Sequence, residues 1–139
     1  MGEVVDLVSS ALRRKLLDHG ARSLSEAEWH LLRVSHLLNA IEDGTLERLL
    51  ADSPLAELLA LADGLDAIDR PEAARHMRWA ATELAAANDP GNGLKRAETV
   101  TATTQVLAGR FVRARAGVEE HLLNYAFELR ELQPEGLSA

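Results

Sequence analysis

The sequence predicts an all-α, single-domain protein, a bundle of about six or seven helices whose last helix is long. Leucine and alanine dominate it, aromatic residues make up only 4% of it, and β-branched residues rarely cluster. Leucine and alanine favour helices, whereas strands select β-branched and aromatic residues. Apolar residues also recur at helical spacing, most clearly near the end of the chain. We therefore expect residues 1–139 to form one helical domain.

The first two helices are predicted from amphipathic spacing and a capping motif. Residues 4–17 form a first amphipathic helix. Ser25 followed by Glu28 makes a capping box, in which each side chain accepts a hydrogen bond from the backbone amide of the other residue. Gly44 ends or bends this second helix. Its apolar side comprises Leu31, Val34, Leu38 and Ile41.

Two further helices are predicted from their start signals. Ser53 and Pro54 match the N-cap and the first position of a helix. The apolar residues of that helix are Leu55, Leu58, Ala62 and Leu65. Asp69 and Glu72, on either side of Pro71, open another helix. Its inner side is predicted to be Ala73, Met77, Ala80 and Leu84.

The last third of the chain contains one loop motif and the longest helix. The sequence NDPGNG at 88–93 predicts a loop. The stretch ETVTATTQV at 98–106 does not favour one structure, because β-branched residues resist helix formation. A helix from about 106 to 132 would span roughly 40 Å. Its apolar stripe consists of Phe111, Ala114, Val118, Leu122, Tyr125, Leu129 and Leu132.

The composition also limits where the protein works. The sequence has no cysteine, so it offers no disulfide framework and no thiolate metal site. The first residues, MGEVVDLVSSALRRK, lack the order of charged, apolar and small residues of a secretory signal. No apolar run reaches the roughly 18 residues of a membrane span. We expect a cytoplasmic protein without a membrane partner.

Motifs for catalysis and for metal binding are weak. His30 and His36 are too far apart to share one side of a helix, and neither an HExxH motif nor a phosphate-binding glycine loop occurs. Glu72 and His76 stand at i and i+4, the spacing of a surface ion pair. Spacing does not test a Ser/His/Asp triad, whose members meet only in the fold. We expect no catalytic residue, metal or cofactor; the remote alternative is an enzyme or metal protein that uses Glu72, His76 and neighbouring carboxylates.

Charge is the most informative feature. The formal net charge is −7, which would repel a phosphate backbone, so direct binding to nucleic acid is not expected. Between residues 42 and 72, nine acids stand against Arg48 and Arg70, and this segment alone carries the net −7. Such asymmetry indicates a basic partner. The nine acids are Glu42, Asp43, Glu47, Asp52, Glu57, Asp63, Asp66, Asp69 and Glu72.

The same acids also have a structural interpretation. Asp43, Asp52 and Asp69 are predicted at helix starts, where a carboxylate accepts backbone amide protons and meets the positive end of the helix dipole. Asp63 and Asp66, one turn apart, fit a solvated helix face. Charge counting alone leaves both interpretations open.

The run LSEAEWHLLRVSHLLNAIEDGTLERLLADS, followed by ALADGLDAIDRPEAARHMRWA, resembles the bacterial DNA-mimic-protein-like domain of unknown function, a helical family. The resemblance covers about residues 24–132. Where a helix of the family ends in Asn-Asn-Gly-Gly, this sequence has Glu42, Asp43, Gly44 and Thr45. Carboxylates thus replace the two amides, which strengthens the acidic interpretation at these positions.

Two other family motifs have counterparts in this sequence. Asp52 and Ser53 occupy the family's Asn-Ser, and Leu65, Ile68 and Asp69 match its Leu-x-x-Ile-Gly turn. The final run RFVRARAGVEEHLLNYAFEL resembles the closing helix of the family. The resemblance implies a helical fold and a DNA-mimic role, in which an acidic surface occupies the DNA-binding face of a repressor. It implies no catalytic residue.

We therefore expect a non-enzymatic acidic interaction protein, a DNA mimic that blocks a basic DNA-binding regulator or nuclease. Apolar contacts at the centre of that interface would come from Leu46, Leu49 and Leu50, which equally fit the core. The alternative is a structural module that forms a homodimer through Leu123 and Phe127. The residues predicted to bind the partner are Glu42, Asp43, Glu47, Asp52, Glu57, Asp63 and Asp66.

Overall fold

The computed structural model describes the backbone of residues 3–87 and 93–132, and the side chains of residues 10–20, 22–87 and 95–128. Within these ranges the protein is all α-helical apart from one short 3-10 turn, which confirms the predicted fold class. The elements are α1 (Glu3–His19), η1 (Ala21–Ser23), α2 (Glu26–Asp43), α3 (Leu46–Asp52), α4 (Leu55–Ala67), α5 (Pro71–Ala86) and α6 (Gly93–Leu132).

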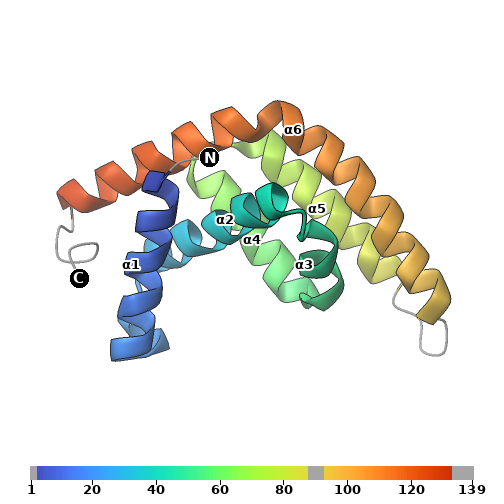
Figure 1. Cartoon of the computed structure of the whole chain (residues 1–139), viewed down its shortest axis with the longest axis horizontal. Coiled ribbons are helices and arrows are strands. Elements are labelled where there is room, and N and C mark those ends of the chain that lie inside the picture. The colour runs from blue at the N-terminus through green and yellow to red at the C-terminus, as the bar shows by residue number, and fades with distance from the viewer. Residues whose placement is uncertain (1–2, 88–92, 133–139) are drawn as a thin grey trace.

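The helix α6 is the longest element and forms an arch over the others (Figure 1). Helices α4 and α5 pack against each other, α5 packs against α6, and α2 packs against both α4 and α6. Helix α1 contacts mainly α2 at one end of the molecule, and α3 contacts α6 at the other end (Figure 1). One core joins all six helices, and its largest fully buried side chains include Phe111, Leu12, Leu31, Leu37, Leu65 and Met77.

The capping signals of α2 operate as predicted. The amide of Glu28 donates to Ser25 Oγ over 3.1 Å, and the amide of Ser25 donates to Glu28 Oε1 over 3.0 Å. Gly44 ends the helix in the left-handed conformation, with φ 73°, which glycine adopts without steric cost. Three of the four predicted apolar residues of α2 are buried, and Ile41 packs partly buried against the core.

The predicted starts of α4 and α5 are each displaced by one residue. Ser53 closes α3, because its amide donates to the carbonyl of Leu49, and Pro54 takes the N-cap position of α4 instead. Asp69 does not cap α5: it adopts a left-handed conformation with φ 64° in the preceding turn, and Arg70 is the N-cap. The predicted inner side of α5 is buried throughout.

The predicted start of the last helix was wrong, because α6 begins at Gly93 and includes the ambiguous stretch 98–106. The hydroxyls of Thr101 and Thr104 donate to the carbonyls of Ala97 and Val100 over 3.1 and 2.7 Å, so these side chains find partners within the helix. Val100, Thr103 and Leu107 are buried, and α6 packs against α5, α2 and α3. Packing thus outweighs the weak helix propensity of β-branched residues. Of the predicted loop 88–93, residues 88–92 lie outside the described residues.

The turn between α4 and α5 is held against α6. His121 Nδ1 donates to the carbonyl of Ile68 over 3.0 Å. One helical turn earlier, a Cβ added to Gly117 would lie 3.1 Å from the guanidinium carbon of Arg70. A larger residue at 117 would therefore require the Arg70 guanidinium to move by a few tenths of an ångström. Both contacts join the turn between α4 and α5 to α6.

A buried ion pair joins α1 to α2. Lys15 Nζ lies 3.2 Å from both carboxylate oxygens of Glu28, whose side chain is only 2% exposed. Arg13 Nε also donates to His36 Nε2 over 3.2 Å. Neither contact has a local signal in the sequence, because the paired residues lie on different helices. None of the described helices is long and apolar enough to cross a membrane.

Candidate interaction surface

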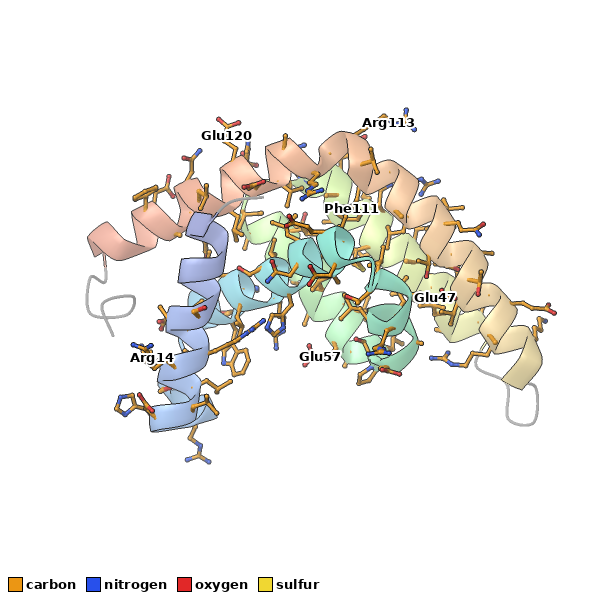
Figure 2. All side chains as sticks on the ribbon, in the orientation of Figure 1. Arg14, Glu47, Glu57, Phe111, Arg113 and Glu120 are labelled. Atoms are coloured by element: carbon orange, nitrogen blue, oxygen red, sulfur yellow. The ribbon has the colours of Figure 1, made fainter. Side chains whose placement is uncertain are left out.

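All seven acids predicted to bind a partner are exposed. Glu42 and Asp43 end α2, Glu47 and Asp52 lie on α3, and Glu57, Asp63 and Asp66 lie on α4. Figure 2 shows Glu47 on α3 and Glu57 on α4, on the side of the molecule opposite the crest of the arch. The structure then divides the seven residues into a group paired with arginines and an unpaired group.

Two acids of the paired group meet arginines from distant helices. Glu42 Oε2 lies 3.5 Å from Arg115 of α6. Glu57 Oε2 accepts a hydrogen bond of 3.3 Å from Arg33 of α2, and the Arg33 guanidinium also lies 5.2 Å from the ring centre of Trp29. Exposed pairs of this kind add little stability, but they cancel charge that a partner would otherwise meet.

The other two paired acids share one arginine. Arg78 of α5 reaches Asp63 Oδ1 at 3.0 Å and Asp66 Oδ2 at 2.5 Å. The hydrogen bonds that Arg78 donates to Asp66 and Asp63 raise the pKa of Arg78 above its ordinary value. Residues 42–72 contain nine acids and two arginines, a formal charge of −7. When the three arginines that pair with these acids from other helices, Arg33, Arg78 and Arg115, are included, the formal charge becomes −4.

Asp43, Glu47 and Asp52 form the unpaired group, which we name the α3 corner. Within the described part of the chain, none of the three has an ion pair. Glu47 accepts a hydrogen bond of 2.6 Å from the hydroxyl of Thr101, which leaves its charge uncompensated. The α3 corner is therefore where the acidic segment keeps its charge.

The helix-start interpretation of these acids was wrong for Asp43 and Asp52. Asp43 is the last residue of α2, and Asp52 is the last residue of α3. A carboxylate at the C-terminal end of a helix faces the negative end of the dipole and is disfavoured there. Since Gly44 was predicted to end α2, the sequence already contained the signal that places Asp43 at a helix end.

Asp43 and Asp52 line the same hollow, whose volume is about 430 Å³. Arg13, His36 and Arg48 line it as well. Burial and the neighbouring Arg13 lower the pKa of His36 below its ordinary value, which disfavours its charged form. Two negative helix ends thus converge on one concave site, together with two carboxylates and two arginines.

Arg96 of α6 links the C-terminal ends of α3 and α5. Its guanidinium donates to the carbonyl of Ala51 and to the carbonyl of Leu84, each over 3.4 Å. These carbonyls belong to the last turns of α3 and α5, where backbone acceptors lack helical partners. Arg96 also borders a larger hollow of about 690 Å³ between α3 and α6, together with Glu47, Arg48, Asp52 and Thr101. Sequence reasoning missed Arg96, because its role depends on two helices that are distant in the chain.

Of the three leucines predicted to contact a partner, only Leu49 lines the hollow of about 430 Å³. Leu46 and Leu50 are buried in the core, and Leu49 packs against it. The exposed apolar residues of the acidic segment are instead Leu55 and Leu59 of α4, which are 46% and 40% exposed. Leu55 also lines a groove of about 340 Å³ between α4 and α5, whose lining combines apolar side chains with Ser53 and Arg96.

The two residues predicted to form a dimer seam differ in their exposure. Phe127 is 58% exposed, whereas Leu123 packs against the core. Phe127 therefore offers more of its side chain to a second copy than Leu123 does, and the homodimer stays a prediction.

The residues of the enzyme alternative lie on α5. Glu72 and His76 form the predicted exposed pair, with 3.9 Å between Oε1 and Nε2. Arg110 Nη1 lies 3.4 Å from His76 Nδ1, and its guanidinium lies 4.7 Å from the ring centre of Trp79. Burial and Arg110 lower the pKa of His76. The described residues contain no group of three or more side chains placed to hold a metal ion.

Removing the charge of Asp43 or Asp52 is expected to stabilise the fold. We expect Asp43→Asn and Asp52→Asn each to raise the free energy of unfolding by about 0.3–1 kcal/mol at low salt, because each relieves an unfavourable charge–dipole contact. Glu47→Gln removes an equal charge from the first turn of α3, where the dipole favours an acid, so it is expected to destabilise slightly. Urea unfolding at low and high salt measures the three changes. Equal signs for all three would show that net charge, and not helix position, decides.

Comparisons of this chain with protein-family models, with curated proteins and with solved structures found no match.

Proposed function

We propose that this protein is a non-enzymatic interaction protein whose α3 corner binds a basic surface of another protein. The observation that carries the proposal is the position of Asp43 and Asp52 at the C-terminal ends of two successive helices, facing one hollow. These carboxylates cost the isolated fold stability. Local choices that oppose stability are typical of functional sites.

The electrostatics support a cationic partner. Helix C-termini carry partial negative charge, which adds to the carboxylates of Asp43 and Asp52. Arg13 and Arg48 line the same hollow and offset the formal charge of these two carboxylates, so the excess negative charge comes from the two helix ends and from Glu47. Glu47 extends the negative surface along α3. A lysine or arginine of the partner would relieve the repulsion within this surface, and such complementarity speeds association and weakens with salt.

The apolar surface beside the α3 corner supports a partner that is not purely charged. Tight interfaces need well-packed apolar contacts near their centre. Leu55, Leu59 and the groove between α4 and α5 lie next along the chain from Asp52. We infer that the partner presents basic side chains around an apolar one.

DNA-binding regulators and nucleases are the class of partner that fits this description, because their DNA-binding faces are basic. The DNA-mimic role remains our proposal for the biological outcome. B-DNA carries one negative charge per about 1.7 Å of its axis, so three unpaired carboxylates mimic only a short part of a duplex. The geometry therefore favours a small basic contact over a long DNA-like ladder.

The test is capture of partners by the purified protein from lysate. We expect the wild type to recover a basic protein at about 50 mM salt and to lose it at about 500 mM. A variant with Asp43→Asn, Glu47→Gln and Asp52→Asn is expected to recover none of it, while keeping its helical circular dichroism. Short duplex DNA added to the lysate is expected to displace the partner when the contact uses a DNA-binding face.

The matched control removes three exposed acids elsewhere: Asp18→Asn, Glu83→Gln and Glu128→Gln, on α1, α5 and α6. It has the same formal charge as the triple variant of the α3 corner, and we expect it to retain the partner. Equal recovery by both variants would refute the α3 corner as the binding site. Recovery that duplex DNA does not affect would refute the DNA-mimic role alone.

A further inference from the structure

A continuous stripe of exposed residues runs along the outer side of α6, within the part of the chain whose side chains the structure describes. It runs along the convex side of the arch, away from the other helices (Figure 1). Its members recur at helical steps of three and four, and all of them are exposed: Val106, Gly109, Arg113, Ala116, Glu120, Asn124 and Phe127. Arg113 and Glu120 have no ion pair within the described part of the chain. Both point outward near the crest of the arch (Figure 2).

The side chains of this stripe complement those of a second copy of the helix that runs antiparallel to the first. About a centre between Ala116 and Gly117, the basic Arg113 exchanges places with the acidic Glu120. The apolar Val106 likewise exchanges places with the apolar Phe127. The exposed residue next to this centre is Ala116, whose small side chain allows two helices to approach closely. An antiparallel copy of the same helix therefore presents the complementary charge at each position of Arg113 and Glu120.

We propose that the protein forms a symmetric homodimer in which the crests of two α6 helices cross in antiparallel orientation. The two-fold axis passes beside Ala116, and Arg113 of each copy faces Glu120 of the other. The interface is isologous, as in most dimers, so each contact occurs twice. This inference is independent of the proposed partner, because the dimer uses none of Asp43, Glu47 or Asp52.

The shape of α6 decides how strong this dimer is. Because the outer side is convex, two copies meet closely at the crest, and their ends diverge. Arg113 and Glu120 are about 10 Å apart along the helix axis, so both lie near the crossing point. Val106 and Phe127 lie farther out and contribute less. The buried area is consequently at the small end for specific interfaces, and the association is weak and concentration-dependent.

The test is sedimentation equilibrium of the full chain from about 10 μM to about 1 mM protein. We expect the wild type to show a monomer–dimer equilibrium in this range. Arg113→Glu alone and Glu120→Arg alone each place like charges opposite each other twice and are expected to weaken association at least about tenfold. The double variant restores opposite charges and is expected to return to within about threefold of the wild type.

Arg14→Glu is the control, because Arg14 is an exposed arginine of α1 that lies away from the crest (Figure 2). It makes the same charge change as Arg113→Glu and is expected to leave association unchanged. Circular dichroism confirms that each variant is folded. A wild type that stays monomeric at about 1 mM, or a double variant that fails to recover, would overturn the proposal.

The absence of cysteine from the sequence permits a second, independent measurement. Ala116→Cys places a thiol beside the proposed axis, where two copies approach closely enough to form a disulfide. We expect oxidation to convert this variant to a covalent dimer. Thr82→Cys, on the exposed side of α5, is expected to remain monomeric at the same concentration. Equal crosslinking of the two variants would contradict the crest contact.

Discussion

Phe111→Ala is expected to lower the free energy of unfolding by about 3–5 kcal/mol, which is a large part of the stability of a domain of this size. Phe111 is the largest of the fully buried side chains in the core. It points from the underside of the arch into the bundle (Figure 2). Truncation removes its apolar contacts and leaves a cavity where α6 covers the other helices.

Phe127→Ala is the matched control, because the sequence has only two phenylalanines and both lie on α6. Phe127 is 58% exposed, so its truncation is expected to change stability by less than about 0.5 kcal/mol in dilute protein. Urea denaturation gives both values. A loss below about 1 kcal/mol for Phe111→Ala would show that the core under the arch is not packed as described.

Lys15→Met is expected to lower the free energy of unfolding by about 2–3 kcal/mol. The substitution keeps most of the apolar stem but removes the ammonium that contacts both carboxylate oxygens of Glu28. Glu28 is 2% exposed and would keep only the hydrogen bond from the amide of Ser25. A buried charge that loses its partner costs more than the pair itself contributes. Thermal unfolding followed by circular dichroism measures the loss.

Glu28→Gln in the Lys15→Met background separates the charge from the cap. Glutamine still serves at the third position of a capping box, but it carries no buried charge. We therefore expect this double variant to recover part of the lost stability. Arg14→Met changes the exposed neighbour of Lys15 and is expected to have little effect. A double variant less stable than Lys15→Met would contradict the account of an unpaired buried charge.

The sequence predicted features whose signals lie within a few neighbouring residues. The capping box of Ser25 and Glu28, the stop at Gly44 and the buried side of α5 all behave as predicted, because capping and amphipathic burial act within one or two helical turns. Where the end of one helix and the start of the next fall on the same residue, the observed helix start differs from the predicted one by one residue. Ser53 is a good N-cap residue, but its amide is used in closing α3.

For the acidic segment, local sequence patterns predicted the candidate residues but not their ion pairs. The sequence identified seven acids as candidates to bind a partner, and the structure places them, all exposed, on α2, α3 and α4. Nothing near Glu57 in the sequence indicates Arg33, and nothing near Glu42 indicates Arg115. Only the fold selects the α3 corner as the place where charge is left unpaired, because ion pairs depend on which helices become neighbours.

The sequence by itself determined the helical class, the apolar stripes that make the core and the net negative charge, because these follow from residue type and spacing. Tertiary structure decided that the threonine-rich stretch 98–106 is helical, since burial of Val100 and Thr103 within it, and of Leu107 next to it, offsets its weak propensity. It also decided which carboxylates keep their charge and that the outer side of α6 faces solvent. These outcomes depend on contacts between residues far apart in the chain, and such contacts leave no pattern in the local sequence.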